Sequence, residues 1–345
     1  MRLRHVLATL TAGLAAATTL TAAGPAVARS ADSPADHACS SIVSLDRFSD
    51  ALDKTTYDGT FVGNFSALAV DRDGSLAALA DRSSLFDLDA KTLAPKSAVH
   101  LADENGRDLD SEGLVIDRDG TRLITSEVEP SIRRYSPAGE ILDRLPVPSS
   151  LLVAPAGRAT SNQTFEGLTL LPGGHTLLAS MEDPIAGDSA DLVRFQTWTR
   201  TGDGHFRLAA QYAYRIDAGL GVPEVQATPD GRLLVLERGF TAGVGNTVRL
   251  YLADPRHATD TSGIENLTDE SGVRLVKKTL LTDIAACPSL GATAKQPQPN
   301  PLLDNIEGMT ITGRDRTGRL KVVLVSDDNQ NPVQTTRFYY LRVRV

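Results

Sequence analysis

The chain has 345 residues, of which 41% are hydrophobic, so its length suits one large domain or two small ones with a sizeable core. It has 35 Lys and Arg against 43 Asp and Glu, a formal net charge of -8. This balance argues against nucleic acid or an anionic membrane as a partner.

Residues 1–28 have the pattern of a secretory signal peptide. Arg2 and Arg4 precede an uncharged Ala/Thr/Leu stretch, and Ala26 and Ala28 supply the small residues that signal peptidase accepts. A membrane anchor is the alternative, but the stretch is weakly hydrophobic, and no later segment approaches ~20 continuous apolar residues. We therefore predict a secreted protein with no membrane attachment after cleavage, an N-terminal extension over 29–54 and one domain over 55–345.

The two cysteines, Cys39 and Cys287, are predicted to form a disulfide, because an exported chain with an even cysteine count favours one. Two unpaired thiols are the alternative. There is no Cys-x-x-Cys pair, so a structural zinc site is not expected.

Five segments of the chain share one plan. Each has an apolar alternating run, a Gly-centred turn, a second apolar run and an acidic end, which is typical of a β-hairpin. They cover residues 65–82, 110–127, 164–183, 223–238 and 305–328. Most are followed by a short basic-aromatic strand. Repeats at this spacing predict an all-β propeller with four antiparallel strands in each blade.

We expect six blades, with five or seven as alternatives, because the last gap has room for a degenerate blade over 247–283. The C-terminal strand at 335–345 is expected to close the ring beside residues 55–62, which would remove exposed sheet edges. Residues 285–301, rich in Pro, Gly and Gln, are predicted as a surface loop.

Acidic residues recur at matching places in these hairpins. With a two-residue turn, Glu112 would lie opposite Glu127, Glu307 opposite Asp328, and Glu224 opposite Glu237. The opening residue of each inner strand and the acid that ends its neighbour would then lie at the same end, around an acid-lined mouth.

Like charges directly opposite each other are unfavourable, so these pairs need an explanation. A divalent cation is one, since calcium collects carboxylate oxygens; pairing with arginines and simple solvation are the others. For the metal we single out Glu112, Glu127, Glu166, Glu307 and Asp328. The Glu-Gly dipeptide has an alternative explanation, because glycine permits close packing near a crowded axis.

Motifs for other chemistries are missing from the sequence. It has no Gly-x-Ser-x-Gly elbow, no Gly-x-x-x-x-Gly-Lys loop and no His-Glu-x-x-His run. A serine esterase of the α/β-hydrolase type is therefore disfavoured.

The blade-opening residues resemble those of the phytase-like family, described as "esterase-like activity of phytase". The resemblance rests on residues 65–68, 111–114, 165–168 and 304–309 and on the Arg-Phe-Tyr strand near the end, and it covers about 61–341. It implies a propeller that hydrolyses phosphate or carboxylic esters. The Glu-Gly dipeptide also resembles that of gluconolactonase-like propellers, where such a glutamate binds metal; Ser66-Ala67 and Glu224-Val225 depart from it.

Together these observations predict a hydrolase for small-molecule esters, acting as a monomer. Its catalytic residues would be Glu112, Glu166 and Glu307, around a divalent cation, calcium in first place. Substrate charge would be met by arginines, for which we single out Arg82, Arg134, Arg238 and Arg337. The alternatives are a non-catalytic ligand-binding propeller and a metal-dependent lactonase.

Overall fold

The computed structural model describes residues 37–201 and 204–345, which belong to one compact unit. The predicted signal peptide at 1–28 lies outside the described residues. The described residues contain no α-helix, and none of their helices is long and apolar enough to cross a membrane. Three short 3-10 helices lie in the connections: η2 (Ser149–Leu151), η3 (Asp269–Ser271) and η4 (Ile284–Ala286).

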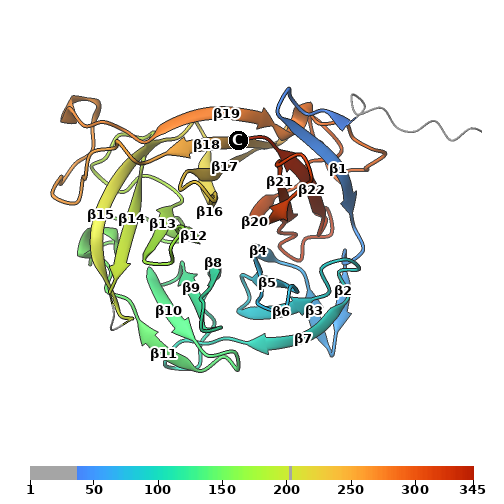
Figure 1. The fold of residues 1–345 in the computed structure, drawn as a ribbon, viewed down its shortest axis with the longest axis horizontal. Helices are drawn as coiled ribbons and strands as arrows, with labels where there is room; N and C mark the ends of the chain where they lie inside the picture. The colour runs from blue at the N-terminus through green and yellow to red at the C-terminus, as the bar shows by residue number, and fades with distance from the viewer. Residues whose placement is uncertain (1–36, 202–203) are drawn as a thin grey trace, which may run out of the picture. The chain divides into compact units, whose positions relative to one another are not determined.

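The strands form five antiparallel sheets of four strands each and one two-stranded hairpin (Figure 1). Blade 1 contains β4 (Phe65–Val70), β5 (Leu76–Ala80), β6 (Ser84–Leu88) and β7 (Pro95–His100). Blade 2 contains β8 (Ser111–Ile116), β9 (Arg122–Ser126), β10 (Ser131–Tyr135) and β11 (Ile141–Arg144). Blade 3 contains β12 (Phe165–Leu170), β13 (Thr176–Met181), β14 (Leu192–Arg200) and β15 (Phe206–Arg215).

Blade 4 contains β16 (Gly221–Ala227), β17 (Leu233–Thr241), β18 (Gly245–Asp254) and β19 (Lys277–Asp283). Blade 5 contains β20 (Ile306–Arg314), β21 (Leu320–Ser326), β22 (Phe338–Val343) and β1 (Val43–Ser49). The inner strands β4, β8, β12, β16 and β20 contact one another in this order, and β20 contacts β4, which closes the ring. The predicted all-β propeller with four-stranded blades is confirmed.

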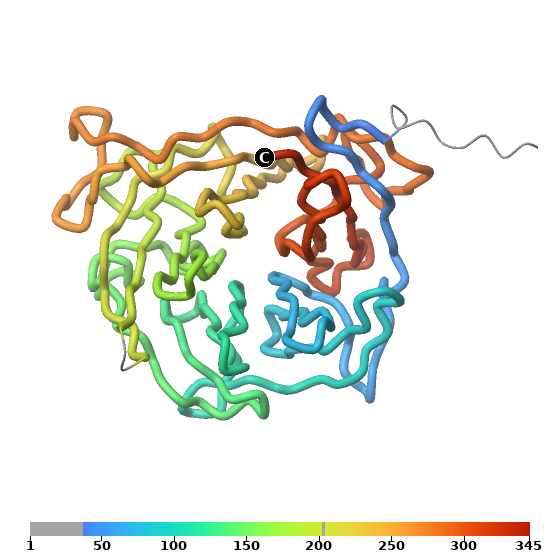
Figure 2. Tube along the Cα trace, viewed as in Figure 1, coloured from blue at the N-terminus to red at the C-terminus, as the bar shows by residue number. Residues whose placement is uncertain are grey.

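The blade number differs from the expected six. Residues 247–283, expected to hold a degenerate sixth blade, instead supply most of β18 and all of β19, the outer strands of blade 4. Blade 4 uses up this length because β17 and β18 are long and because residues 255–276 form an extended connection. The trace in Figure 2 shows this connection leaving the ring and returning to it.

The ring closes with a strand other than the expected one. β22 pairs with β1, with Leu341 opposite Leu45, so the first strand of the described chain completes the last blade. Residues 55–62 form a separate hairpin of β2 (Thr55–Tyr57) and β3 (Thr60–Val62). The segment 29–54, expected to be an extension, therefore contains a blade strand.

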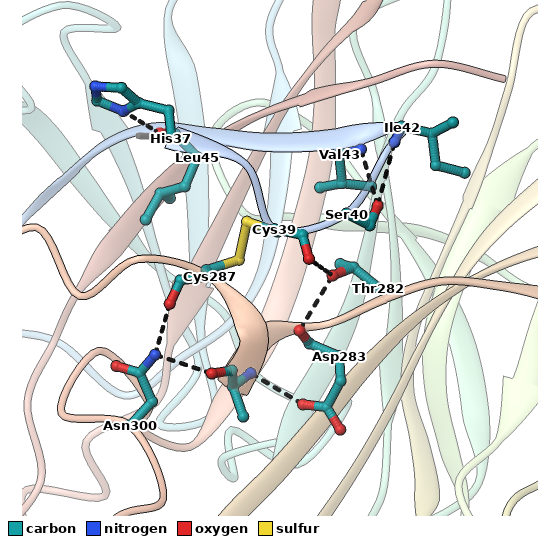
Figure 3. The surroundings of a disulfide bond; sticks show 11 residues. His37, Cys39, Ser40, Ile42, Val43, Leu45, Thr282, Asp283, Cys287 and Asn300 are labelled. Carbon is teal, nitrogen blue, oxygen red and sulfur yellow. Dashed lines mark hydrogen bonds between the residues drawn. A yellow bond between two sulfur atoms is a disulfide. The ribbon is translucent and has the colours of Figure 1, made fainter. Parts of the chain in front are cut away.

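The predicted disulfide between Cys39 and Cys287 is confirmed. It joins the residues before β1 to the end of η4, across a sequence separation of 248 residues. Neighbouring hydrogen bonds hold the same junction: the Thr282 hydroxyl donates to the Cys39 carbonyl, and the Asn300 amide donates to the Cys287 carbonyl (Figure 3). A cross-link that closes so long a loop stabilises the fold mainly by restricting the unfolded chain.

The hydrophobic core lies between the blades. Five clusters of buried side chains each join two neighbouring blades, because successive residues of a blade strand point to opposite faces and so to different neighbours. Between blades 2 and 3, for example, Leu123 packs with Phe165 and Trp198. Full burial of each large side chain contributes about 1.5–3 kcal/mol, so the ring is held together blade by blade.

Candidate active site

One cavity of about 540 Å³ lies where the inner strands begin. Residues from all five blades line it: Ser66, Asp81, Arg82, Asp108, Asp110, Glu112, Glu127, Val128, Asn162, Glu166, Glu182, Arg238, Asn305, Glu307, Asp327 and Asn329. Nine of these are Asp or Glu and two are Arg, so the cavity is strongly acidic.

Two sets of equivalent positions build this lining. In four blades, the residue that directly follows the second strand donates its backbone N–H to a carbonyl near the start of the inner strand; in blade 2, Glu127 donates to Asp110. The residue two places after that carbonyl, Glu112 in blade 2, is the opening position of the inner strand. In blade 4 the matching partners are Arg238 and Gly221. We call the first set the opening ring: Ser66, Glu112, Glu166, Pro223 and Glu307. We call the second set the closing ring: Asp81, Glu127, Glu182, Arg238 and Asp327.

A β-bulge occurs at the opening ring in every blade. The strand register shifts at Ser66, Glu112, Glu166 and Glu307, and in blade 4 at Val222 and Pro223. A bulge sets two residues against one and re-aims a side chain, which is why bulges recur beside functional sites. Here the side chains at four of the five bulges border the cavity.

The glycines after the opening glutamates have a packing role. A Cβ at Gly113 would lie 2.4 Å from the Glu166 carbonyl oxygen, and one at Gly167 would lie 2.4 Å from the Val225 nitrogen. Each glycine thus lets the next inner strand approach closely. This agrees with the packing explanation of the Glu-Gly dipeptide and leaves the glutamate itself to be explained.

The predicted cross-strand acid pairs are wrong in register. The hairpin of blade 2 has a three-residue loop, because the Asp117 N–H donates to the Thr121 carbonyl, and the bulge adds a second shift. Glu112 therefore lies in the bulge rather than opposite Glu127. The two glutamates still converge on the cavity.

The same slip displaces the acid expected opposite Glu307. Asp327, and not Asp328, occupies the closing ring of blade 5 and lines the cavity. Asp328 is buried next to it, where its carboxylate accepts from the Asn64 N–H and pairs with Lys54. The structure thus places the predicted ligand Asp328 outside the cavity lining.

Blade 4 departs from the acidic pattern at both positions. Glu224 lies one residue past the opening ring, opposite Leu236, and it does not line the cavity. Glu237, its expected partner, accepts from the Tyr214 hydroxyl and pairs with Lys278. What blade 4 gives to the cavity is Arg238, the cation of the closing ring.

Burial raises the pKa values of the glutamates that line the cavity. Glu112, Glu127 and Glu166 are 7%, 3% and 5% exposed. Burial and the neighbouring carboxylates raise the pKa of Glu112 and of Glu166 well above the ordinary value. Burial likewise raises the pKa of Glu127 to about 8, although the hydrogen bond from the Thr164 N–H opposes the shift. Burial raises the pKa of Glu182 to about 7, although the positive charge of Arg238 opposes the shift.

Arginines pair with some of the cavity acids and not with others: Arg82 Nε lies 3.7 Å from Asp81 Oδ1 in blade 1, and Arg238 pairs with two glutamates. Arg238 Nη2 lies 3.0 Å from Glu307 Oε1 and 3.3 Å from Glu182 Oε1. In contrast, no Lys or Arg in the described part of the chain comes within ion-pair distance of Glu112, Glu127 or Glu166. Pairing with Arg238 therefore accounts for Glu307 and in part for Glu182. Burial rules out free solvation for Glu112, Glu127 and Glu166.

Glu127 belongs to two groups of acids that could hold a metal ion. Ligand oxygens of Asp110, Glu112 and Glu127 lie within 4.8 Å of one another, and so do those of Glu127, Glu166 and Glu182. Two oxygens on opposite sides of a calcium ion are about 5 Å apart, since each lies 2.3–2.6 Å from the ion. The all-oxygen set suits a hard cation.

Two cavity-lining atoms are also left without a hydrogen bond. Ser66 Oγ and Asp81 Oδ1 are buried and have no partner, although Arg82 Nε lies 3.7 Å from the latter. Buried polar atoms are nearly always paired. These two atoms are an independent sign that the cavity receives a polar ligand or solvent.

The four arginines predicted to bind substrate are separated by the structure. Arg82 and Arg238 line the cavity. Arg134 instead donates to Asp117 at the opposite end of blade 2. Arg337 is 1% exposed and donates to Asp50 and to backbone carbonyls. Arg134 and Arg337 thus lie outside the cavity lining, where they bind parts of the fold to one another.

Several lining residues were not singled out from the sequence. Asp110 lies two residues before the predicted Glu112, and Asp327 lies one residue before the predicted Asp328, so for these two the sequence signal was present and the register was not. Glu182 directly follows the second strand of its hairpin, as Glu127 does in blade 2. The side chains of Asn162, Asn305 and Asn329 come from loops, which hairpin symmetry does not cover.

The fold and this cavity define a five-bladed β-propeller with an acidic site at one end of its inner strands. The sequence model of the phytase-like family, described as "Esterase-like activity of phytase", matches residues 60–330, and the chain belongs to this family. The resemblance predicted from the sequence is thereby confirmed. A comparison with curated protein sequences found no significant match.

Solved structures with a similar fold include three enzymes. A gluconolactonase from Xanthomonas campestris has a TM-score of 0.41 and 15% identity, with 82% of this chain and 73% of that chain covered. A virginiamycin B lyase from Staphylococcus aureus has a TM-score of 0.39 and 10% identity, covering 84% and 83%. An aldose sugar dehydrogenase from Streptomyces coelicolor has a TM-score of 0.39 and 14% identity, covering 88% and 98%. These values are too low to transfer an activity to this chain.

Proposed function

We propose that the protein is a secreted, cation-dependent hydrolase of small-molecule esters and that the acidic cavity is its active site. The observation that carries this proposal is the position of Glu127. It is buried, shared by two carboxylate groups of metal-binding size, and without a cationic side chain to neutralise it among the described residues. Family membership supports the ester class of substrate, and the disulfide supports secretion.

The cation would be held by the acids on the blade 2 and blade 3 side of the cavity: Asp110, Glu112, Glu127, Glu166 and Glu182. Calcium is the candidate, because the ligands are all carboxylate oxygens at a suitable spacing. A bound divalent cation supplies a Lewis acid that polarises the oxygen of the scissile ester group.

The remaining chemistry falls to side chains of this chain. Arg238 faces the cavity between Glu182 and Glu307 and would stabilise negative charge that develops on the substrate. Of the predicted catalytic residues, Glu112 and Glu166 would act chiefly as cation ligands and Glu307 as the partner that orients Arg238.

The test is hydrolysis by the purified protein of p-nitrophenyl acetate, p-nitrophenyl phosphate and a lactone, each with calcium and with chelator. We expect calcium-dependent turnover of at least one ester and a loss of at least 100-fold in Glu127→Gln. Glu140→Gln, which changes an exposed glutamate outside the cavity, is the matched control and should keep full activity.

Two outcomes would contradict the proposal. Turnover that survives the chelator would remove the cation from the mechanism. Calcium-dependent stabilisation without turnover of any substrate would instead favour a ligand-binding propeller.

A further inference from the structure

We propose that two exposed apolar side chains at the rim of the cavity, Val128 and Phe240, bind the apolar arm of an uncharged ester. The substrate is then a carboxylic ester rather than a phosphate monoester. This inference rests on the proposed function and names the substrate class of the same site.

Val128 places apolar surface directly in the cavity lining. It follows Glu127 of the closing ring and is 63% exposed, although the residues around it are acidic. A single exposed valine needs no explanation by itself. Its position among the lining residues is what gives it a role, since its apolar surface is available to a ligand in the cavity.

Phe240 lies two residues after Arg238 on the blade-4 hairpin of β17 and β18. The pairing of β17 with β18 is regular from Arg238 opposite Val248 to Thr241 opposite Gly245, with no bulge. Successive side chains therefore alternate, and Phe240 shares the face of Arg238, about 7 Å further along the strand. Arg238 lines the cavity, and Phe240 is 56% exposed. From this shared face we infer that the Phe240 ring borders the solvent side of a ligand held by Arg238.

The charge of the cavity decides which ester fits. With every carboxyl ionised, the form that cation binding favours, two arginines and nine carboxylates give a formal charge of 2 − 9 = −7. For the same lining residues, one bound divalent cation would leave a net charge of −7 + 2 = −5, and two would leave a net charge of −7 + 4 = −3. A phosphate monoester would add about −1.5 to −2 at neutral pH, whereas a carboxylic ester adds none. Repulsion of the anion and apolar contact at the rim both favour the uncharged substrate.

The experiment compares three substrates with one leaving group: p-nitrophenyl butyrate, acetate and phosphate, all with calcium. For the parent protein we expect kcat/KM for the butyrate ester to be about 10-fold higher than for the acetate ester, which is within the effect of buried methylene groups. We expect kcat/KM for the phosphate ester to be lower than for both carboxylic esters. Inorganic phosphate at millimolar concentration should not inhibit.

Phe240→Ser should raise KM for butyrate about 5–10-fold and leave kcat and the acetate reaction unchanged, the size expected for a lost apolar contact. The matched control is Leu142→Ser, which removes an equally exposed apolar side chain, 53% exposed, from the outer strand β11. Both variants should melt with the parent, because neither side chain is part of the core.

The inference is overturned if p-nitrophenyl phosphate is the preferred substrate, or if Phe240→Ser keeps the butyrate-to-acetate ratio of the Leu142→Ser control. In either case the proposed hydrolase function stands. Absence of turnover with all three substrates would instead remove the proposed function, and this inference with it.

Discussion

Two carboxylates at opposite ends of the same hairpin of blade 2 are equally buried and behave in opposite ways. Asp117 follows β8 and is 2% exposed, and Glu127 follows β9 and is 3% exposed. Burial favours the neutral form of Asp117, but hydrogen bonds led by Arg200, with Arg134 among them, outweigh it and lower its pKa to about 2. Burial and neighbouring acids raise the pKa of Glu127 to about 8.

The difference shows that burial alone does not make a site. At Asp117 the chain supplies its own counter-charges: Arg200 Nη2 and Arg134 Nη1 donate to the carboxylate over 2.7 and 2.9 Å. At Glu127 it supplies one backbone N–H, from Thr164, and more acids. A buried acid whose neutralisation is left to something outside the chain is a candidate ligand, whereas one that the chain neutralises is part of the fold.

The largest difference in stability should come from removing the carboxylate charge at one end of this hairpin or at the other. Asp117→Asn should destabilise the protein by about 3 kcal/mol, because it removes the ion-pair partner of Arg200 and leaves Arg134 with only the more distant Asp119. Glu127→Gln should be no less stable than the parent when a chelator is present, because it relieves repulsion. Chemical denaturation of the two variants measures this, and an equal loss in both would remove the contrast between the two ends.

The second prediction concerns pH. A carboxyl whose pKa is raised on folding contributes stability that is complete below its unfolded pKa and is lost as the pH rises through its folded pKa. With folded pKa values of about 7 for Glu182 and about 8 for Glu127, the cation-free protein should lose stability from about pH 4.5 to pH 8. Melting curves in chelator should show this decline.

Calcium should flatten the decline, because it binds the ionised carboxylates of the native state and stabilises it by mass action. Asp117 has the opposite sign: its lowered pKa gives stability above about pH 4 that is lost as the pH falls toward 2. A stability that does not change between pH 5 and pH 8 in chelator would contradict the raised pKa values.

The third prediction separates the two sides of the cavity. Glu307→Gln removes a partner of Arg238 and should lower stability by about 1–2 kcal/mol in chelator while keeping most of the stabilisation by calcium. Glu112→Gln, on the side without an arginine, should lose most of that stabilisation. Thermal unfolding with and without calcium tests both, and the reverse order would move the cation to the Arg238 side.

The smallest effect is expected from two serines whose hydroxyls have no hydrogen-bond partner, Ser66 in the cavity lining and Ser180 on β13 away from it. Ser66→Ala and Ser180→Ala should each change stability by less than about 0.5 kcal/mol, because neither loses an internal bond. Only Ser66→Ala should alter the KM for an ester. Equal effects of both variants on KM would show that Ser66 has no contact with a ligand.

The hairpin repeat, the propeller and the acid-lined end of its inner strands were predictable from the sequence, because alternation and turn residues are local signals. The partner of a particular acid was not. A single bulge shifts the pairing by one residue, so Asp327 lines the cavity where Asp328 was predicted. In blade 4 the residue that lines the cavity is Arg238, whereas the predicted pair Glu224 and Glu237 does not line it. Bulges depend on packing against the next blade and leave little trace in the sequence.

By itself, then, the sequence determined which residue types meet at one end of the blades, and also the disulfide, since Cys39 and Cys287 are its only cysteines. The tertiary structure decided the number of blades and the strand that closes the ring, because both depend on how residues 247–283 and Val43–Ser49 pair with distant strands. It also decided which buried acids are neutralised. Arg200 reaches Asp117 from another blade, and no arginine among the described residues pairs with Glu127; side-chain reach across blades is a property of the folded ring alone.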